Sequence, residues 1–312
     1  MRKAALTTIA ELVEADERVV FVGSDLGAGT MDDVRSRHPQ RVLMEGIAEQ
    51  HLVGFAAGLA LEGYIPYVHT IATFLTRRAL EQTIVDVALH DLPVRLIGAG
   101  GGMVYAPLGP THQAIDDFAL MRSIPSMTVG APADPHEMST MLRLLAATAG
   151  PAYVRIAKGG EPDITRGLEE LKVGCARQVV DGDALAILTT GALLHECLDA
   201  VQRLDADGVT ATLVHFPFVA PLDVGVVLSL AETHKDLLVV EEHLPSGGLA
   251  SAIADVLADK GSSARLHRAT LPARYADRYG SQQEHWSLHG IDADGITARV
   301  RSLLAERARG GS

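Results

Sequence analysis

Short runs of aliphatic and β-branched residues alternate with longer segments whose apolar residues recur at helical spacing. The short runs are typical of buried strands, and the longer segments are typical of amphipathic helices. In the first half of the chain, the strand-like runs lie at 19–26, 64–71, 93–100, 126–132 and 151–158. The helix-like segments lie at 1–17, 47–63, 73–91, 112–124 and 134–150. This alternation predicts a doubly wound, mainly parallel sheet.

Residues 158–183 interrupt the alternation, because they are polar and contain several glycines. We expect a linker there, with a short hairpin. A second alternation follows, with strand-like runs at 184–190, 210–216 and 237–243 and helices that begin near residues 192, 223, 248 and 294. We therefore predict an α/β fold of two doubly wound domains, the second one smaller. Their boundaries are 1–160 for the first domain, 161–181 for the linker and 182–312 for the second domain.

Composition and charge exclude several classes of protein. The 312 residues carry a net charge of −12 and no run of Lys or Arg, which argues against nucleic-acid binding. No apolar run reaches the roughly 18 residues of a membrane span, and Glu11 and Glu14 are atypical of a signal peptide. Cys175 and Cys197 are far apart and form no CxxC motif. We expect both to be reduced thiols in a cytoplasmic protein.

Candidate chemistry is expected at the carboxyl ends of the first set of strands, where open α/β sheets bind ligands. The segments there are 23–29, 44–51, 69–74 and the glycine-rich 98–112. They contain no Walker A, GxSxG or HExxH motif, and GAGGGM lacks the last glycine of GxGxxG. Residue patterns alone therefore predict only an α/β protein with a glycine-rich loop near His112.

Several longer motifs carry a specific resemblance. GIAEQHLVGFAAGLALEG, ATFLTRRALEQTIVDVALHDLPV, GPTHQAIDDFALMRSIPSMTV and VVEEHLPSGGLASAIADVL occur in this order along the chain. Together the sequence resembles the C-terminal half of transketolases and deoxyxylulose-phosphate synthases over nearly its whole length. The resemblance implies a pyrimidine-binding domain for thiamine diphosphate, followed by the transketolase C-terminal domain.

The resemblance implies a catalytic and cofactor-binding role for Glu49, whose counterpart bonds N1′ of the aminopyrimidine. A carboxyl removed from water can share a proton with a ring nitrogen, although an acid at a helix N-terminus is also stabilised by the helix dipole alone. Nearby Glu45 is expected to be structural or a proton relay. Phe74 matches the aromatic residue that packs on the aminopyrimidine.

Further positions of this predicted pocket follow from the same motifs. Transketolases have aromatic residues three and six positions after Phe74, where this chain has Arg77 and Leu80. Arg77 resembles the synthase branch, so we expect a less aromatic pocket that Ile71 lines and that Asp25 of the GSDL segment borders.

Substrate contacts are also implied by the resemblance. His112 of GPTH matches a histidine near the reacting carbons of the donor, where it hydrogen-bonds a developing hydroxyl or alkoxide. Arg2 and Arg155 match arginines suited to bidentate phosphate recognition, although a solvated terminal arginine is an equal alternative for Arg2.

Three departures from the family pattern concern the substrate. Leu108 stands where an acidic residue reads the hydroxyl beside the reacting carbonyl, and Gly100 stands where the family has a histidine. A phosphate-binding serine is replaced near Gly29 and Thr30. Leucine cannot bond a hydroxyl, so we expect an acceptor that lacks an α-hydroxyl, or an amino aldehyde, presented free or on a carrier protein.

The diphosphate and metal site of the family is missing. Thiamine enzymes hold the diphosphate through Mg²⁺ with a GDG motif and a later asparagine, but this sequence has no GDG and no asparagine at all. It also begins where the pyrimidine-binding domain begins. We therefore expect no metal ligands here, and a separately encoded N-terminal subunit that holds Mg²⁺ and the diphosphate in a heterotetramer.

The implied reaction is transfer of a two-carbon ketol unit from a ketose, presumed a phosphate, to an aldehyde. Pyruvate-decarboxylating carboligation, as in deoxyxylulose-phosphate synthases, is the first alternative. A 2-oxo acid dehydrogenase β-like subunit is the second alternative, and a non-catalytic regulatory subunit is the third. The non-catalytic alternative is disfavoured because the chain keeps the residues that the resemblance makes functional, namely Glu49, Phe74, His112 and Arg155.

Overall fold

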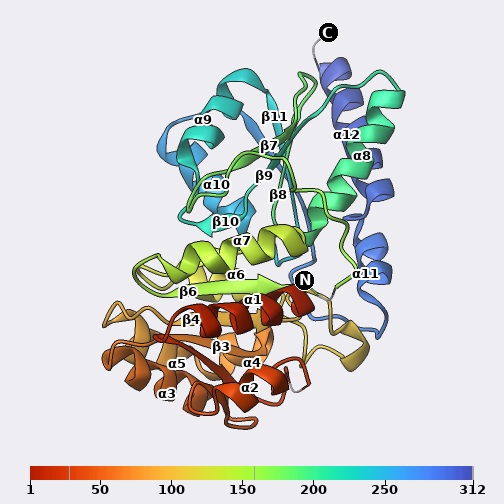
Figure 1. The fold of residues 1–312 in the computed structure, drawn as a ribbon. Coiled ribbons are helices and arrows are strands. Elements are labelled where there is room, and N and C mark those ends of the chain that lie inside the picture. The colour runs from red at the N-terminus through yellow and green to blue at the C-terminus, as the bar shows by residue number, and fades with distance from the viewer. Residues whose placement is uncertain (28, 158, 311–312) are drawn as a thin grey trace.

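The chain folds into two α/β lobes, each built on its own sheet, in a computed structural model that describes residues 1–27, 29–157 and 159–310 (Figure 1). The first sheet has seven strands in the order β10-β5-β6-β4-β3-β1-β2. Six of its strands are parallel, and β10 pairs antiparallel with β5. Its strands are β1 (Val19–Gly23), β2 (Val42–Met44), β3 (Ile65–Ile71), β4 (Arg95–Ala99), β5 (Thr128–Gly130), β6 (Ala152–Ile156) and β10 (Phe218–Ala220).

Helices cover both faces of this sheet, because its central strands are buried throughout and carry apolar residues on both sides. On one face α1 packs on α7, over Phe21 and Tyr67. On the other face α3 and α4 pack over Val68. The helices are α1 (Arg2–Ala15), α2 (Asp32–Arg37), α3 (Glu49–Leu61), α4 (Ala72–Arg78), α5 (Leu80–Gln82), the π-helical turn η1 (Thr83–Ala88), the 3₁₀ turn η2 (Ala106–Leu108), α6 (Asp117–Arg122) and α7 (Pro135–Ala146).

The second lobe holds a five-stranded sheet in the order β12-β11-β8-β9-β7, in which only β7 is antiparallel to its neighbour. Helices α8 and α12 pack side by side along one of its faces (Figure 1). The elements are β7 (Arg177–Val180), β8 (Ala186–Thr189), η3 (Gly191–Leu193), α8 (Leu194–Ala206), β9 (Thr212–His215), α9 (Val224–Thr233), β11 (Asp236–Glu241), α10 (Leu249–Asp259), β12 (Arg265–Thr270), α11 (Gln282–His289) and α12 (Ala293–Gly310).

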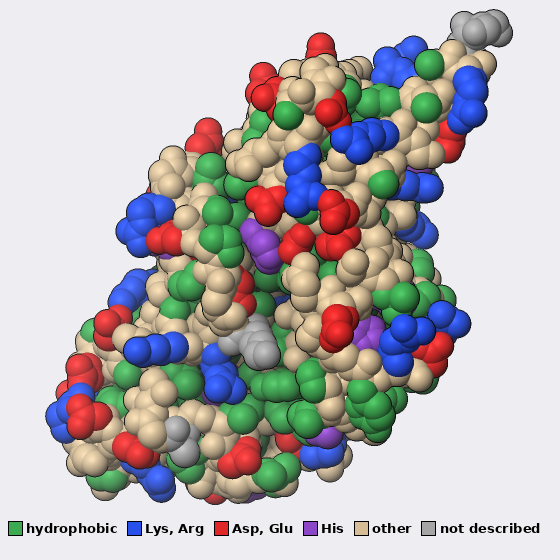
Figure 2. Space-filling model, turned by 90° about the vertical axis from the view of Figure 1, so that its right-hand side faces the viewer, with side chains coloured by type: hydrophobic (Ala, Val, Ile, Leu, Met, Phe, Trp, Pro, Cys, Tyr) green, Lys and Arg blue, Asp and Glu red, His purple; other side chains and the backbone are tan. Residues whose placement is uncertain are grey.

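A continuous apolar core joins the two lobes. One cluster of buried side chains runs from Leu52 and Leu75 in the first lobe through Phe118 to Val214 and Ile253 in the second. On the face shown in Figure 2, hydrophobic side chains gather across the middle of the first lobe, below a second lobe with charged side chains of both signs. The lobes are therefore packed together rather than tethered.

The predicted fold class of two doubly wound α/β units, the second smaller, is confirmed. Asp134 caps α7, since its side chain accepts a hydrogen bond from Glu137 N at 2.8 Å and Pro135 is the first helical residue. Cys175 and Cys197 are both free. Among the described residues, no helix is long and apolar enough to cross a membrane.

Three local predictions differ from the structure. The helix expected at 73–91 is broken into α4, α5 and η1, and the helix expected at 112–124 is reduced to α6, because Ala114 pairs instead with the glycine turn at 101–102. The hairpin expected within 158–183 is absent from the described residues, because β7 pairs with β9. The predicted domain boundaries stay a prediction, although two strands bear on them. The predicted linker ends in a strand of the second sheet, and β10 returns from the second half of the chain to complete the first sheet.

Candidate active site

Glu49 opens helix α3 and lies in the interior, although its charge would favour the surface. Its side chain is only 1% exposed. Oε2 accepts a 2.6 Å hydrogen bond from Nη1 of Arg78, and Oε1 accepts a long one of 3.4 Å from the hydroxyl of Thr70. Thr70 lies near the carboxyl end of β3, where a ligand of an open parallel sheet would sit.

Phe74 and His112 complete a continuous set of contacts with Glu49. Phe74 is on α4, which follows β3 directly, and Ile71 is the residue at the start of that helix. The Arg78 guanidinium lies 4.4 Å from the centroid of the Phe74 ring. The His112 ring meets the same phenyl ring edge-on, with 5.1 Å between centroids. The structure thus brings Glu49, Phe74 and His112 into one site, together with Arg78.

The loop that presents His112 is tied to α4 by an ion pair. Nε and Nη2 of Arg77 donate to the Asp116 carboxylate at 2.7 to 3.1 Å. Leu108 is the last residue of the 3₁₀ turn η2, four positions before His112. It is 54% exposed, so this loop presents an apolar side chain to solvent. Arg77, which was predicted to border the cofactor pocket, is therefore engaged in positioning the loop.

Three successive glycines after β4 make room for three large side chains. A Cβ atom at Gly100 would lie 2.1 Å from the Tyr105 ring, one at Gly101 would lie 2.1 Å from Arg155, and one at Gly102 would lie 2.3 Å from Glu242. Gly100 also has a φ of +79°, which disfavours other residues. A side chain at position 100, such as the histidine that the resemblance implies, would therefore clash with the ring of Tyr105.

Arg155 is held by contacts within the chain, and its phosphate-binding role stays a prediction. Its Nε and Nη2 pair with the Asp117 carboxylate, Nη1 donates to the Glu242 carbonyl, and Nη2 also donates to the Ala114 carbonyl. Its guanidinium stacks on Phe118 at 3.7 Å. Burial alone would raise the pKa of Asp117, but the adjacent Arg155 holds that pKa below its usual value. The guanidinium is therefore satisfied within the chain.

Arg2 and Asp25 are both exposed, and Asp25 follows the carboxyl end of β1. Asp25 accepts a hydrogen bond from Ser24 Oγ at 3.1 Å. Arg2 lies near His69, a fully buried residue of β3 whose Nε2 has no partner in the described chain. Burial lowers the pKa of His69 to about 4, partly offset by its hydrogen bond with the Ile97 carbonyl. Neither Arg2 nor Asp25 makes a described hydrogen bond with Glu49 or His112.

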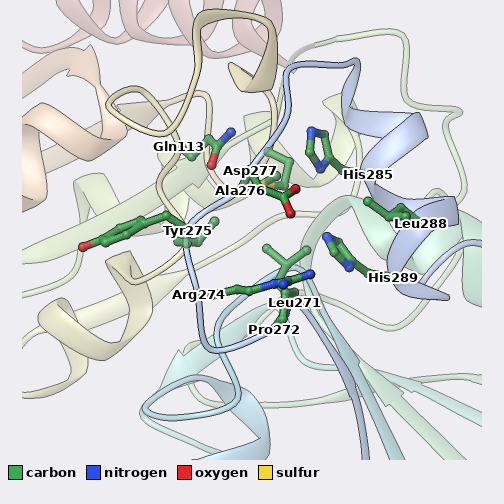
Figure 3. A pocket seen from close by; sticks show the side chains of 12 residues that line it. Gln113, Leu271, Pro272, Arg274, Tyr275, Ala276, Asp277, His285, Leu288 and His289 are labelled. Atoms are coloured by element: carbon green, nitrogen blue, oxygen red, sulfur yellow. The ribbon is translucent and has the colours of Figure 1, made fainter.

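A small cavity lies between the segment that carries Gln113 in the first lobe and residues 271–289 of the second lobe (Figure 3). Gln113, directly after His112, and His285 of α11 line it, and their polar side-chain atoms are buried without partners among the described residues. His285 and His289 project from α11 toward the segment that carries Arg274 and Asp277 (Figure 3). At about 10 Å³ this cavity has room for about one water molecule, which is too small for a substrate. No described group of three or more His, Cys, Asp or Glu side chains could hold a metal ion.

Comparison with known families agrees with the two-lobe architecture. Residues 1–161 match the model of the transketolase pyrimidine binding domain, and residues 174–296 match that of the transketolase C-terminal domain. This chain belongs to the transketolase family.

The curated relatives include 1-deoxy-D-xylulose-5-phosphate synthases. Two curated relatives are 1-deoxy-D-xylulose-5-phosphate synthase 2 of Geobacter sulfurreducens, 38% identical over 96% of this chain, and the synthase of Thioalkalivibrio sulfidiphilus, 39% identical over 95%. These matches cover 48% and 46% of the relatives, so the chain spans about half of their length.

Solved structures of the transketolase family add a relative of matching size. A chain described as a split gene transketolase in an inactive β4 tetramer superposes with a TM-score of 0.87 at 29% identity, over 97% of both chains. A transketolase variant from Pichia stipitis shares the fold, with a TM-score of 0.79 at 20% identity over 97% of this chain and 45% of that one.

Two residues of the site were missed from the sequence. Arg78 lies within the motif that begins with ATFLTRR, but the resemblance suggested a role only for the adjacent Arg77. Tyr105 gave no periodic signal, although the run of glycines at 100–102 indicates that large side chains elsewhere must fill their space. The sequence could have suggested such a close approach but not which side chain makes it.

Proposed function

We propose that this chain is one subunit of a thiamine diphosphate-dependent, transketolase-like enzyme of the cytoplasm. In this proposal the enzyme transfers a two-carbon ketol unit from a ketose phosphate to an aldehyde. The observation that carries it is the clustering of Glu49, Phe74 and His112 at the carboxyl edge of a sheet in a domain of the transketolase pyrimidine-binding family.

The residues present fit the aminopyrimidine of thiamine diphosphate. Glu49 offers a buried carboxylate oxygen as acceptor, Phe74 offers a half-buried aromatic ring, and Ile71 stands at the start of the same helix. When bound, thiamine diphosphate supplies a nucleophilic thiazolium carbon for cleavage of the bond beside a carbonyl group. Glu49 would hold a proton at N1′, away from water, and Phe74 would pack against the pyrimidine ring.

His112 is suited to act on the substrate. Its ring lies against Phe74, and its Nδ1 lies 2.9 Å from the hydroxyl of Thr111, which leaves Nε2 for a hydroxyl or an oxyanion of the donor. Exposed Leu108 offers no hydrogen bond on this loop. Its position supports an acceptor that lacks an α-hydroxyl, or an amino aldehyde, free or attached to a carrier protein.

A separate N-terminal subunit would hold the diphosphate and Mg²⁺. The sequence has neither a GDG motif nor an asparagine, and its structural relative of equal length is described as a split gene transketolase. Large exposed side chains around α3 and η1 are suited to an extensive apolar interface. They are Ile47, Leu61, Ile84, Val85 and Leu89. In this proposal two copies of each subunit form a heterotetramer.

A second reaction has its own support. The curated relatives named above, at 38% and 39% identity, are 1-deoxy-D-xylulose-5-phosphate synthases, and Arg77 resembles their motif. The alternative is therefore a pyruvate-decarboxylating carboligase, or a 2-oxo acid dehydrogenase β-like subunit.

The deciding experiment combines this chain with its separately encoded partner, thiamine diphosphate and Mg²⁺. Ketose phosphate and pyruvate are then offered as donors with a panel of aldehydes. Turnover of the ketose supports the transketolase reaction, and release of CO₂ from pyruvate supports the alternative. Glu49→Ala should abolish turnover while the complex still assembles. Unchanged activity of that variant would instead identify a non-catalytic subunit.

A further inference from the structure

Arg78 holds both of the groups that the aminopyrimidine would need. Its Nη1 donates to Glu49 Oε2 at 2.6 Å, and its guanidinium carbon lies 4.4 Å from the Phe74 ring centroid. These are the acceptor oxygen and the aromatic surface that the proposed function assigns to the cofactor ring. One side chain of this chain therefore satisfies both groups at once.

A guanidinium is a close chemical substitute for that ring. It is planar and delocalised, presents N–H donors in its own plane, and stacks on aromatic faces. An aminopyrimidine that carries a proton at N1′, and so donates that N–H to Glu49, would share each of these properties. A flexible aliphatic ammonium would share only the donor, so the match is specific to the type of residue at position 78.

We propose that Arg78 occupies the aminopyrimidine position in the cofactor-free chain and competes with thiamine diphosphate for Glu49 and Phe74. This inference rests on the proposed function and concerns occupancy of the same site. Arg78 is then a residue that sets cofactor affinity, rather than a catalytic residue. It leaves when the cofactor ring enters.

The difference in burial between Glu49 and Arg78 explains why a guanidinium would occupy the site in the absence of the cofactor. Glu49 is 1% exposed, so an empty site would leave a buried carboxylate whose remaining bond is the 3.4 Å contact with Thr70. Uncompensated buried charge is strongly destabilising. Arg78 is 45% exposed, so its side chain can swing into water at little cost. The pair stabilises the empty site and can open from the solvent side.

Competition predicts opposite effects on stability and on cofactor binding. Only the fraction of molecules with Arg78 displaced can accept the cofactor ring, so the apparent dissociation constant is the intrinsic one divided by that fraction. Removing the guanidinium should therefore tighten cofactor binding about tenfold, if roughly one molecule in ten is open. The same change should lower the melting temperature of the cofactor-free protein, because Glu49 loses its partner.

The test measures thiamine diphosphate binding to the assembled complex, by calorimetry in Mg²⁺, together with melting curves without cofactor. Arg78→Ala is compared with the natural chain and with Arg143→Ala. Arg143 is a matched control, since it is 50% exposed and its ion pair with Glu11 lies elsewhere on the surface. Arg78→Gln keeps a neutral donor for Glu49 and covers the case in which Arg78→Ala does not assemble. We expect tighter binding and a lower melting temperature for both Arg78 variants, and neither change for the control.

Two outcomes would overturn the inference while leaving the proposed function intact. Unchanged cofactor affinity with a lower melting temperature would make the pair purely structural. Weaker affinity would mean that Arg78 orients Glu49 for the cofactor instead of competing with it. If neither the natural complex nor any variant binds thiamine diphosphate, the proposed function itself fails, and the inference fails with it.

Discussion

Replacing Arg155 distinguishes a structural arginine from a phosphate-binding one. In Arg155→Met, the Asp117 carboxylate keeps only the 2.7 Å hydrogen bond from the Tyr153 hydroxyl and has no exposed surface. Breaking a buried ion pair by removing one partner costs about 3–5 kcal/mol. The guanidinium also loses its stacking on Phe118. We therefore expect Arg155→Met to lose several kcal/mol of unfolding free energy.

Urea unfolding followed by circular dichroism measures this loss. A loss of about 3–5 kcal/mol lowers the midpoint by roughly 1–2 M urea at a slope near 3 kcal/mol/M. Arg143→Met is the control, because its exposed ion pair with Glu11 contributes about 1 kcal/mol or less. Adding Asp117→Leu to Arg155→Met should recover part of the loss, since the unpaired buried charge is then removed.

Enzyme kinetics can show that Arg155 is not a structural residue. If Arg155→Met has the same urea midpoint as the natural chain, while the KM for a phosphorylated donor rises in the assembled complex, Arg155 faces the substrate and the structural assignment is wrong. A stability loss with an unchanged ratio of KM between phosphorylated and unphosphorylated donors supports the assignment.

Three further predictions concern other parts of the site. His112→Ala should lower kcat of the complex by about 100-fold or more with little change in melting temperature, and a kcat within threefold of the natural one would argue against its contact with the donor. Leu108→Asp should shift the acceptor preference toward α-hydroxy aldehydes by about tenfold, as kcat/KM ratios would measure, because the exposed position tolerates a carboxylate. Burial lowers the pKa of His69 to about 4, so the unfolded chain binds the extra proton between about pH 6.5 and pH 4. The free energy of unfolding should therefore decrease as the pH is lowered from about 6.5 to about 4, by at most about 1.4 kcal/mol per pH unit. His69→Gln should flatten this part of the curve, and an unchanged slope in urea titrations would show that His69 does not titrate as described.

The regular elements could be predicted from the sequence because long buried strands and amphipathic helices repeat their apolar residues. Strands β2 and β10 have three residues each, too few to show a period. The antiparallel entry of β10 into the first sheet depends on packing between distant segments. The prediction of a helix from residue 112 was wrong because of a similar long-range contact, since Ala114 pairs with the glycine turn at 101–102.

The site residues also divide into those that sequence motifs indicate and those whose contacts depend on the fold. Glu49, Phe74 and His112 lie in motifs, and the structure brings them together without testing their roles. The Arg78 contact with Glu49 joins residues that are 29 positions apart, and the Arg155 pair with Asp117 joins residues 38 apart. Several arginines with similar neighbours compete for such partners, and only the fold decides which carboxylate each one meets.

The position of β10 limits how this protein can be cut into parts. An expression fragment that stops at residue 170 would keep six strands of the first sheet but lose the strand that covers β5. The backbone of Thr128–Gly130 would then be an open edge, available to pair with other fragments. The complementary fragment would carry a short strand with no sheet to join. Separate production of the two halves would therefore favour aggregation, and study of either lobe requires the intact chain.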